Sequence, residues 1–394
     1  MQQTKIADLA RPQFKANPYP FYARLRAEAP VCPTRLLGQP SWLVTRYADV
    51  FAVLKDERLL KDWLPVTRWL HRFGGAITRH MLNQDGPDHI RLRTLVHKAF
   101  TPHLIEQLRS RIQNVCDDLL DQMESNGRME LMSEYALPLP LTVISELLGI
   151  PAEVRDRLHS LSRSTFSASN MLGVVRSWPD QRLLIHRIRK LVAKRRSDPR
   201  DDLITALVQA EEAGDKLTEQ ELVGTIALLM IAGYETTVNL IGTGALTMIQ
   251  HPEQLSRLEE NPALAPSAVE ELLRYTSPLD MASQRFARED LTINSVKISQ
   301  GDLVVAVLGS ANHDETQFPE PERFDITRQP NKHLAFGQGA HFCIGAPLAR
   351  LEGQIALTTL FRRFPGLCLS QAAESLRWRK SLIIRGLEEL PVAI

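Results

Sequence analysis

The sequence predicts a single large domain, residues 1–394, that is mainly α-helical and carries small β-sheets. Helical periodicity covers Pro102–Leu161, where prolines interrupt it, and one long helix with almost no charge is expected at Thr218–His251. Strand-like alternation with turn signals is found chiefly in Ser283–Leu308. Because no low-complexity linker divides the chain, we expect one large core. Residues 1–16 are expected to form a flexible N-terminal segment.

Composition and charge exclude several classes of protein. The chain has 47 Lys and Arg against 46 Asp and Glu, so its formal charge of +1 indicates neither nucleic acid nor an anionic membrane as a partner. The N-terminus lacks the apolar core of a signal peptide, and no uncharged apolar run reaches the ~18 residues of a transmembrane helix. The 4 cysteines are far apart, which argues against a disulfide framework. We expect a soluble, cytoplasmic protein.

Short elements are expected in the first half of the chain. A Pro-led amphipathic helix is followed by a strand at Ser41–Thr45 and by a helix at Tyr47–Leu54. The segment Lys61–Gln84 has no regular period, and its aromatic side chains are expected to anchor a loop to the core rather than to line a pocket. The connection 162–180 is weakly patterned, and a basic helix is expected at Arg182–Arg196.

A helix is expected to begin near Pro87, with Asp85 or Gly86 as its cap. His89 and Arg93 are four residues apart in this segment and therefore share one helix face. On their own they are most simply interpreted as a solvated surface pair.

The long helix has a clear start and an unusual middle. Thr218 and Glu221 have the spacing of a capping box. Glu235 is the one charged residue in Leu222–Gln250, and a carboxylate buried at such a place is too costly to be incidental. Gly233 also costs roughly 1 kcal/mol in a helix interior. Both unusual residues therefore fall at the same point of the helix.

This point of the helix resembles a notch. Ala232 and Thr236 lie one turn apart with Gly233 beside them, so a small gap faces the same side as a hydroxyl. A ligand could enter that gap. The alternative is a glycine kink in which Thr236 bonds backward to a helix carbonyl.

A second charged pair lies in the helix A-V-E-E-L-L-R. Glu271 and Arg274 are three residues apart, which is a weak signal because many such pairs are exposed and worth under ~1 kcal/mol. Glu270 could equally pair with Arg274. The segment P-E-R-F-D, which contains Arg323, follows about fifty residues later.

The strongest chemical signal is the stretch F-G-Q-G-A-H-F-C-I-G at Phe336–Gly345, in which one cysteine, Cys343, is surrounded by glycines. Zinc is disfavoured, because no second cysteine or histidine has the short spacing that a four-ligand site requires. A single thiolate suits an axial bond to haem iron. The alternative is a glycine-rich turn in which Cys343 is a small buried hydrophobe.

The stretch Phe336–Gly345 resembles the cysteine-ligand loop of the cytochrome P450 monooxygenases. The notch at Ala232–Thr236 is similar to the oxygen-binding groove of that family, and the two occur in the same order along the chain. The resemblance implies the cytochrome P450 fold, haem b as cofactor, and Cys343 as the axial ligand of the haem iron. The positive end of the helix that follows Gly345 supports an anionic sulfur.

The resemblance also implies roles for further residues. Thr236 would hold the bound oxygen species by hydrogen bonding, and Glu235 would relay protons to it. Glu271, Arg274 and Arg323 would form a structural lock. The cofactor-binding set comprises His89, Arg93, Ala232, Gly233, Arg285, Phe336, Gly337, His341, Cys343 and Gly345, of which His89, Arg93, Arg285 and His341 would bind the haem propionates. Departures from the family pattern are found at Tyr234, His313 and Glu315.

The resemblance implies a monooxygenase that hydroxylates or epoxidises an apolar or amphipathic small molecule, such as a polyketide, macrolide, steroid or fatty acyl compound. No flavin or nicotinamide fingerprint is present, so electrons are expected from a separate ferredoxin or flavodoxin with its reductase. A monomer is expected. Two alternatives remain open: a peroxide-driven hydroxylase of the same fold, and a haem-bearing binding module without catalysis.

Overall fold

The computed structural model describes residues 6–36, 39–62, 75–98, 100–124, 128–166, 178–212 and 217–394. Residues 63–74 of the irregular segment expected at Lys61–Gln84 and residues 167–177 of the connection 162–180 lie outside these residues. Contacts between residues divide the chain into two compact units. Unit 1 comprises Met1–Leu59, Ile105–Leu139 and Thr236–Ile394, and unit 2 comprises Leu60–Leu104 and Pro140–Glu235.

Helices dominate the fold, as predicted. Their bounds are α1 Pro12–Ala16, α2 Tyr19–Glu28, α3 Tyr47–Lys55, α5 Gly86–His97, α6 Pro102–Gln107, α7 Arg109–Glu124, α8 Pro138–Leu148, α9 Ala152–Phe166, α11 Trp178–Ser197, α12 Leu203–Glu212, α13 Glu219–Ala232, α14 Glu235–Gln250, α15 Pro252–Glu260, α16 Ala265–Thr276, α17 Leu308–Ala311 and α18 Ala346–Arg363. A π-helical turn, Met132–Ala136, precedes α8, and short 3₁₀ turns lie elsewhere, one of them at Gly339–His341.

The strands are short and belong to unit 1 except at the end of β3. They are β1 Val31–Leu36, β2 Gln39–Val44, β3 Leu59–Leu60, β4 Arg128–Glu130, β5 Arg285–Ala287, β6 Leu291–Ile293, β7 Val296–Ile298, β8 Leu303–Ala306, β9 Cys368–Leu369 and β10 Pro391–Ala393. They form a five-stranded sheet of order β1-β2-β8-β5-β3, a three-stranded sheet β4-β10-β9 and the pair β6-β7. The expected alternation in Ser283–Leu308 therefore corresponds to β5, β6, β7 and β8.

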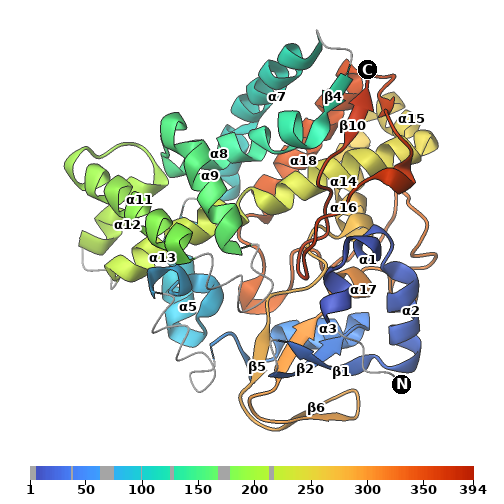
Figure 1. The fold of residues 1–394 in the computed structure, drawn as a ribbon, viewed down its shortest axis with the longest axis horizontal. Helices are drawn as coiled ribbons and strands as arrows, with labels where there is room; N and C mark the ends of the chain where they lie inside the picture. Colours follow the sequence, from blue (N-terminus) through green and yellow to red (C-terminus); the bar gives the residue numbers. More distant parts are fainter. Residues whose placement is uncertain are drawn as a thin grey trace. The chain divides into compact units, whose positions relative to one another are not determined.

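The large sheet of unit 1 positions the start of β5. Strand β2 pairs in parallel with β8, so that Trp42 is opposite Val304, and β5 pairs antiparallel to β8, so that Arg285 is also opposite Val304 (Figure 1). Helix α3 packs on this sheet through buried Val50, which belongs to the same apolar cluster as Val44. Because Arg285 follows this register, its side chain is held on a rigid element.

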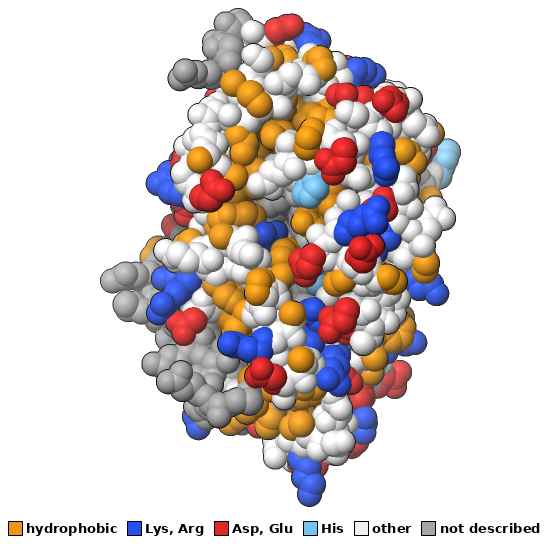
Figure 2. All heavy atoms as spheres, turned by 90° about the vertical axis from the view of Figure 1, so that its right-hand side faces the viewer, with side chains coloured by type: hydrophobic (Ala, Val, Ile, Leu, Met, Phe, Trp, Pro, Cys, Tyr) orange, Lys and Arg blue, Asp and Glu red, His pale blue; other side chains and the backbone are white. Residues whose placement is uncertain are grey.

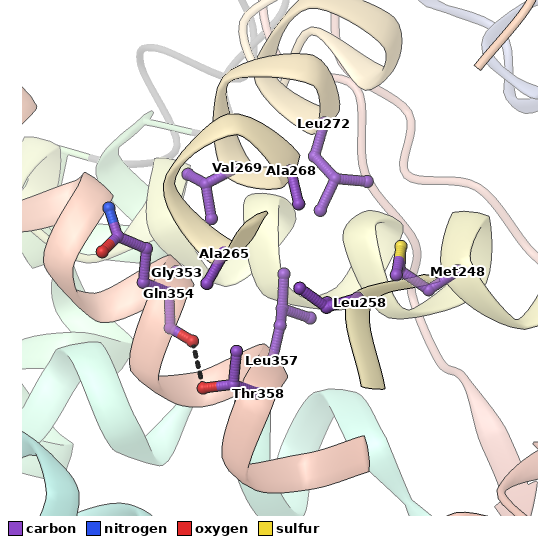
Figure 3. Close-up of a pocket in the computed structure, with 10 residues that line it drawn as sticks. All are labelled: Met248, Leu258, Ala265, Ala268, Val269, Leu272, Gly353, Gln354, Leu357 and Thr358. Carbon is purple, nitrogen blue, oxygen red and sulfur yellow. Dashed lines mark hydrogen bonds between the residues drawn. The ribbon is translucent and has the colours of Figure 1, made fainter. Parts of the chain in front are cut away.

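Helix α18 is the second scaffold of unit 1. It packs against α7 and α16, and Tyr135 donates a hydrogen bond to the carbonyl of Ala356 across 2.8 Å (Figure 1). A dry cavity of about 10 Å³ lies among α14, α15, α16 and α18, lined by apolar side chains that include Met248, Leu258 and Leu357 (Figure 3). Since this volume hardly admits one water molecule, the cavity is a packing feature of the core and no substrate site.

The long helix is interrupted where the unusual residues fall. The capping box of Thr218 and Glu221 is present, but α13 ends at Ala232 and α14 begins at Glu235. Together they form a stretch of 32 residues that is long and apolar enough to cross a membrane, and 78% of its apolar window is buried, as in the core helix of a folded domain. The expected continuous helix is therefore corrected to two helices joined by a turn at Gly233 and Tyr234.

The N-terminal segment also requires a correction. We expected residues 1–16 to be flexible, but Ile6–Ala10 forms a 3₁₀ turn and Pro12–Ala16 forms α1. Lys15 is fully buried, where it pairs with Asp280 and donates to the carbonyl of Leu382 across 3.0 Å. A buried ammonium requires such partners, and they lie more than 260 residues away in the sequence, so no local pattern reveals them.

Candidate functional site

The cysteine loop of unit 1 closes on itself through backbone hydrogen bonds. The N–H of Cys343 donates to the carbonyl of Phe336 across 2.9 Å, and the N–H of Phe342 donates to Gly339 across 3.0 Å. Gly339 has φ of +75°, and a Cβ there would lie 2.8 Å from the carbonyl oxygen of Leu54. A side chain at this position would therefore be both strained and blocked, which explains the glycine.

The thiol of Cys343 is exposed and lies just before a helix. Gly345 is the N-cap of the 18-residue helix α18, which has Pro347 in its first turn. A Cβ added at Gly345 would meet one described side-chain atom within 4 Å, the sulfur of Cys343 at 3.9 Å. The sulfur thus borders open space on this side, and the positive end of the helix favours its anionic form.

Arg285 meets the cysteine loop at the end of α3. Its guanidinium is 5% exposed and donates to the carbonyls of Leu54 and Leu59 across 3.1 and 3.4 Å. Gly339 approaches the same Leu54 carbonyl. His341 ends the 3₁₀ turn of the loop and is half-buried. The structure therefore places Arg285 beside the loop that carries Cys343 and His341.

A charged clamp holds the first residue of the loop. Arg350, in the first turns of α18, lies over the ring of Phe336 at 4.6 Å and makes two hydrogen bonds to Glu270, at 2.6 and 2.9 Å. The Nδ1 of His333 accepts from the N–H of Ala335, so its Nε2 donates to Glu270 across 3.1 Å. Burial tends to raise the pKa of Glu270, but these donors outweigh it and lower the pKa to about 2.

The predicted lock forms in part. Glu271 and Arg274 are both fully buried and joined by two hydrogen bonds of 2.8 Å. Arg274 also donates to the carbonyls of Asn312 and Pro321. Glu270 therefore does not pair with Arg274, which was the other possibility left by the sequence.

The assignment of Arg323 to this lock is wrong. Its guanidinium is 57% exposed and pairs with Glu320, whereas Arg328 donates to Glu271 across 3.1 Å. The neighbouring Phe324 is buried, so Arg323 points away from the core and contributes its backbone carbonyl, which accepts from Arg274 and Arg328. The direction of a side chain in this turn could not be inferred from spacing.

His313 and Glu315, at which the sequence departs from the pattern of the resembled family, both have partners in the structure. His313, buried, lies between the carboxylate of Glu322 at 3.1 Å and the carbonyl of Tyr275 at 3.0 Å. Burial lowers the pKa of His313, although the hydrogen bond to Glu322 opposes this shift. Glu315 pairs with Arg26 at 2.9 Å. Both residues therefore stabilise the segment that leads to the lock.

The helix break at the end of α13 exposes residues of an otherwise buried helix. Leu222–Ile231 is buried throughout, whereas Ala232 is exposed and Gly233 and Glu235 are half-buried. A Cβ at Gly233 would lie 2.5 Å from the carbonyl oxygen of Leu229 and 2.6 Å from the side chain of Ile144. Only glycine therefore fits. Thr236, the first residue of unit 1 after the break, is also half-buried.

The other residues of this part are also partnered. Tyr234 makes a hydrogen bond of 2.8 Å between its hydroxyl and the Nδ1 of His159 on α9. His89 is 3% exposed and Arg93 is half-buried. The two residues therefore do not form the solvated surface pair that their spacing alone suggested. Arg91 ties α5 to the start of α13 through a 2.6 Å contact with Glu221.

The predicted site residues thus fall into two groups. Unit 1 contains Cys343, Phe336, Gly337, His341, Gly345, Arg285, Thr236 and the lock, and unit 2 contains His89, Arg93, Ala232, Gly233 and Glu235. Sequence reasoning missed Arg328, although it follows P-E-R-F-D by three residues, and it missed Glu270, Arg350 and His333 as partners of the loop.

Comparison with known proteins identifies the family. The family model described as Cytochrome P450 matches residues 8–160 and 181–384. The chain belongs to the cytochrome P450 family. It is 44% identical over 398 residues to the polyketide biosynthesis cytochrome P450 PksS of Bacillus subtilis, covering 97% of both chains. It is similar to the crystal structure of a myxobacterial cytochrome P450 in complex with myristic acid, with a TM-score of 0.94 at 40% identity, covering 98% of both chains.

A third cytochrome P450 has been solved in complex with another protein. P450BioI, solved in complex with an acyl carrier protein ligated to hexadec-9Z-enoic acid, is 41% identical to this chain, with a TM-score of 0.90 and coverage of 97% of this chain and 99% of that one. The predicted fold class and the predicted monooxygenase activity are confirmed by these relationships.

The cytochrome P450 family implies a thiolate-ligated haem, redox partners and dioxygen. The residues of unit 1 fit such a cofactor. One exposed cysteine lies at the positive end of a helix, open space borders its sulfur beside Gly345, and a cationic side chain, Arg285, is fixed at the same loop. A single soft thiolate is the donor set of a haem, and within the described part of the chain no group of three or more His, Cys, Asp or Glu side chains could hold a metal ion such as zinc.

One buried carboxyl group on α18 has no role in this cofactor site. Glu352 is fully buried and its two carboxyl oxygens make no hydrogen bond within the described part of the chain. Burial raises the pKa of Glu352 to about 8, and the nearby Thr237 hydroxyl opposes this shift. The group is therefore protonated in the folded protein at neutral pH.

The raised pKa of Glu352 predicts a pH-dependent stability. The folded pKa lies above the unfolded value of 4.5, so the folded protein binds the extra proton and loses stability as pH rises from 4.5 to about 8. The free energy of unfolding of Glu352→Gln, measured relative to that of the wild type, should rise by about 1.4 kcal/mol for each pH unit in this window. Urea titrations at several pH values measure it. Glu253→Gln, at an exposed site, is the control, and parallel curves for Glu352→Gln and wild type would contradict the assignment.

The corrected lock predicts unequal effects of two arginines. Arg328→Ala removes a donor from the fully buried Glu271 and should lower the free energy of unfolding by about 2 to 4 kcal/mol. Arg323→Ala removes an exposed pair and should cost less than about 1 kcal/mol. Urea titration of both variants measures the difference. An equal loss of unfolding free energy in the two variants would mean that Arg323 also belongs to the lock.

Proposed function

We propose that this cytochrome P450 inserts one oxygen atom, by hydroxylation or epoxidation, into a polyketide or fatty acyl chain. The observation that carries the proposal is the 44% identity, over nearly the whole of both chains, with a polyketide biosynthesis cytochrome P450. The similarity to P450BioI, solved with a carrier-bound fatty acid, supports the same substrate class. Macrolides and steroids are the other apolar or amphipathic candidates, and we place the enzyme in the cytoplasm as a monomer.

Haem b is the proposed cofactor, and it would supply the activation of dioxygen when bound. Cys343 is proposed as its axial thiolate. The closed backbone of the loop, with the N–H of Cys343 bonded to Phe336, holds the sulfur in a fixed direction. The clamp formed by Arg350 on Phe336 stiffens this loop further, because a guanidinium that is both stacked and doubly bonded has little freedom.

Four side chains are proposed to bind the haem propionates. Arg285 and His341 come from unit 1, and His89 and Arg93 come from α5 of unit 2. Arginine suits a carboxylate because its planar guanidinium donates two parallel hydrogen bonds. The fixed position of Arg285 on β5 supports this role, since a preorganised donor loses little entropy on binding.

Protons are proposed to pass through Glu235 to Thr236. Glu235 is half-buried at the start of α14, so its carboxylate can exchange protons with solvent. The hydroxyl of the next residue, Thr236, can both accept and donate a hydrogen bond, which would allow it to receive a proton from the side of Glu235 and pass it on toward the haem.

Electrons are proposed to come from a ferredoxin or flavodoxin with its reductase. The acid and alcohol at Glu235 and Thr236 support dioxygen chemistry over a peroxide-driven reaction, because they supply the protons that reduction of dioxygen consumes. Turnover with ferredoxin and dioxygen should therefore exceed turnover with hydrogen peroxide. The substrate class is tested by the Soret shift of the purified haem protein on titration with palmitic acid, a macrolide and testosterone. A shift with testosterone alone would contradict the proposal.

The thiolate assignment predicts a spectroscopic change. Cys343→Ser and Cys343→His should each abolish the thiolate signature of the reduced carbonyl complex, because neither side chain supplies a sulfur. The absorption spectrum of the reduced, carbon monoxide-treated protein measures it, and Cys368→Ser, at another exposed cysteine, is the control. An unchanged spectrum of Cys343→Ser would sink the assignment.

The role of Thr236 predicts uncoupling. In Thr236→Ala the hydroxyl that delivers a proton to the correct oxygen is missing, so a larger share of the electrons should appear as hydrogen peroxide. The ratio of peroxide formed to reductant consumed measures it. Thr237→Ala is the matched control on the next residue, and well-coupled turnover by Thr236→Ala would refute the role.

A further inference from the structure

Helix α11 presents an unbalanced strip of positive charge. Its sequence, W-P-D-Q-R-L-L-I-H-R-I-R-K-L-V-A-K-R-R-S, has a single acidic residue, Asp180. Four basic side chains are spaced four residues apart and are all exposed, and we call them the basic ridge: Arg182, His186, Lys190 and Lys194. Leu184 and Ile188 are fully buried, so the ridge is the outer face of an amphipathic helix.

The ridge differs from the other basic residues of the same helix. Arg189 pairs with Glu219 at 3.1 Å, Arg195 pairs with Asp202, and Arg196 pairs with Glu211. Among the described residues, the four members of the ridge make no ion pair or hydrogen bond through their side chains. The acidic side chains that pair with α11 therefore bind its other basic residues. The positive charge of the ridge has no acidic partner among the described residues.

An uncompensated ridge has an energetic cost. Lys190 and Lys194 are like charges four residues apart on the helix and repel each other, and Arg182 in addition lies near the positive end of the helix. The strip spans about 18 Å from its first to its last member. The chain as a whole has a formal charge of +1, and acidic and basic side chains are interspersed on the face in Figure 2. The ridge is thus a local feature and no consequence of a basic protein.

The chemistry of the ridge fits an acidic helix on another protein. A membrane surface would also require exposed apolar anchors, and the exposed large hydrophobic residues of the described chain (Ile90, Leu104, Phe342, Ile383, Ile394) all lie outside α11. Nucleic acid is disfavoured by the near-neutral net charge. A second helix with carboxylates at a spacing of three or four residues could match the ridge along its whole length.

We propose that the basic ridge of α11 is the docking surface for an acidic helix of a carrier protein that presents the substrate as an attached acyl chain. This inference rests on the acyl substrate class proposed above. It is supported by the carrier-bound fatty acid of P450BioI, which is 41% identical to this chain. Docking through charge gives the complex a fast association rate and a strong dependence on ionic strength.

The test compares two triple variants of the haem-loaded protein. Arg182→Glu/Lys190→Glu/Lys194→Glu reverses the ridge. Arg58→Glu/Arg109→Glu/Arg377→Glu makes the same change of net charge at surface sites whose arginines are already paired with acidic neighbours. The probes are palmitoyl acyl carrier protein and free palmitic acid, and the readout is the dissociation constant obtained from the Soret shift at low and at high salt. The reduced carbonyl spectrum verifies that each variant is folded.

The ridge variant should bind palmitoyl acyl carrier protein at least about tenfold more weakly than wild type, with a smaller salt dependence, and should bind free palmitic acid as wild type does. The control variant should resemble wild type with both probes. Equal binding of the acylated carrier by wild type and ridge variant would overturn the inference. So would a wild type that binds palmitic acid but not the carrier, in which case the proposed substrate class still stands.

Two further outcomes have a definite meaning. A wild type that binds neither probe refutes the fatty acyl part of the proposed substrate class, and with it the inference drawn from that class. A ridge variant that retains carrier binding but is reduced more slowly by ferredoxin, measured by stopped flow, would assign the ridge to the electron donor and overturn the carrier docking.

Discussion

The cysteine loop depends on two neighbouring carboxylates of α16. Glu271 is buried and receives hydrogen bonds from Arg274, Arg328, Asn331 and the N–H of Asp325, so it gathers the chain that leads toward the loop. Glu270, the residue before it, binds His333 on one side of the loop and Arg350 on the other. Removing either carboxylate would leave buried donors without an acceptor, and that penalty makes the arrangement stiff. The loop that carries Cys343, the proposed thiolate ligand, is therefore held in place by a helix that is distant from it in the sequence.

Two glycines are also required in this part of the protein, each because of a specific neighbouring group. Gly339 is required because the carbonyl of Leu54, which also accepts from Arg285, leaves no room for a side chain. Gly233 is required because Leu229 and Ile144 occupy the space of a Cβ. In both places the backbone approaches a neighbour closely, and in both a proposed cofactor contact follows within a few residues. Glycine thus permits close backbone packing both at the cysteine loop and at the helix break.

Many cationic side chains of this protein form ion pairs with nearby acidic side chains. Lys15 and Asp280 are buried together, Arg91 binds Glu221, and even exposed arginines such as Arg363 have acidic neighbours. A cation that is paired in this way offers little net charge to an acidic partner. The basic ridge of α11 departs from that pattern, and its unbalanced charge is why we assign it to recognition and not to stability.

The sequence alone determined the features that depend on local spacing: the capping box at Thr218, the pair Glu271 and Arg274, the glycine-bounded loop around Cys343, and the predominance of helix. Tertiary structure decided every feature whose partners are distant in sequence. It replaced Arg323 by Arg328 in the lock, paired Glu270 with Arg350, buried Lys15 against Asp280 and interrupted the long helix at Gly233. The physical reason is that periodicity reports which face of an element is apolar, whereas the direction of a side chain in a turn and the choice among equivalent charges are set by the surrounding core.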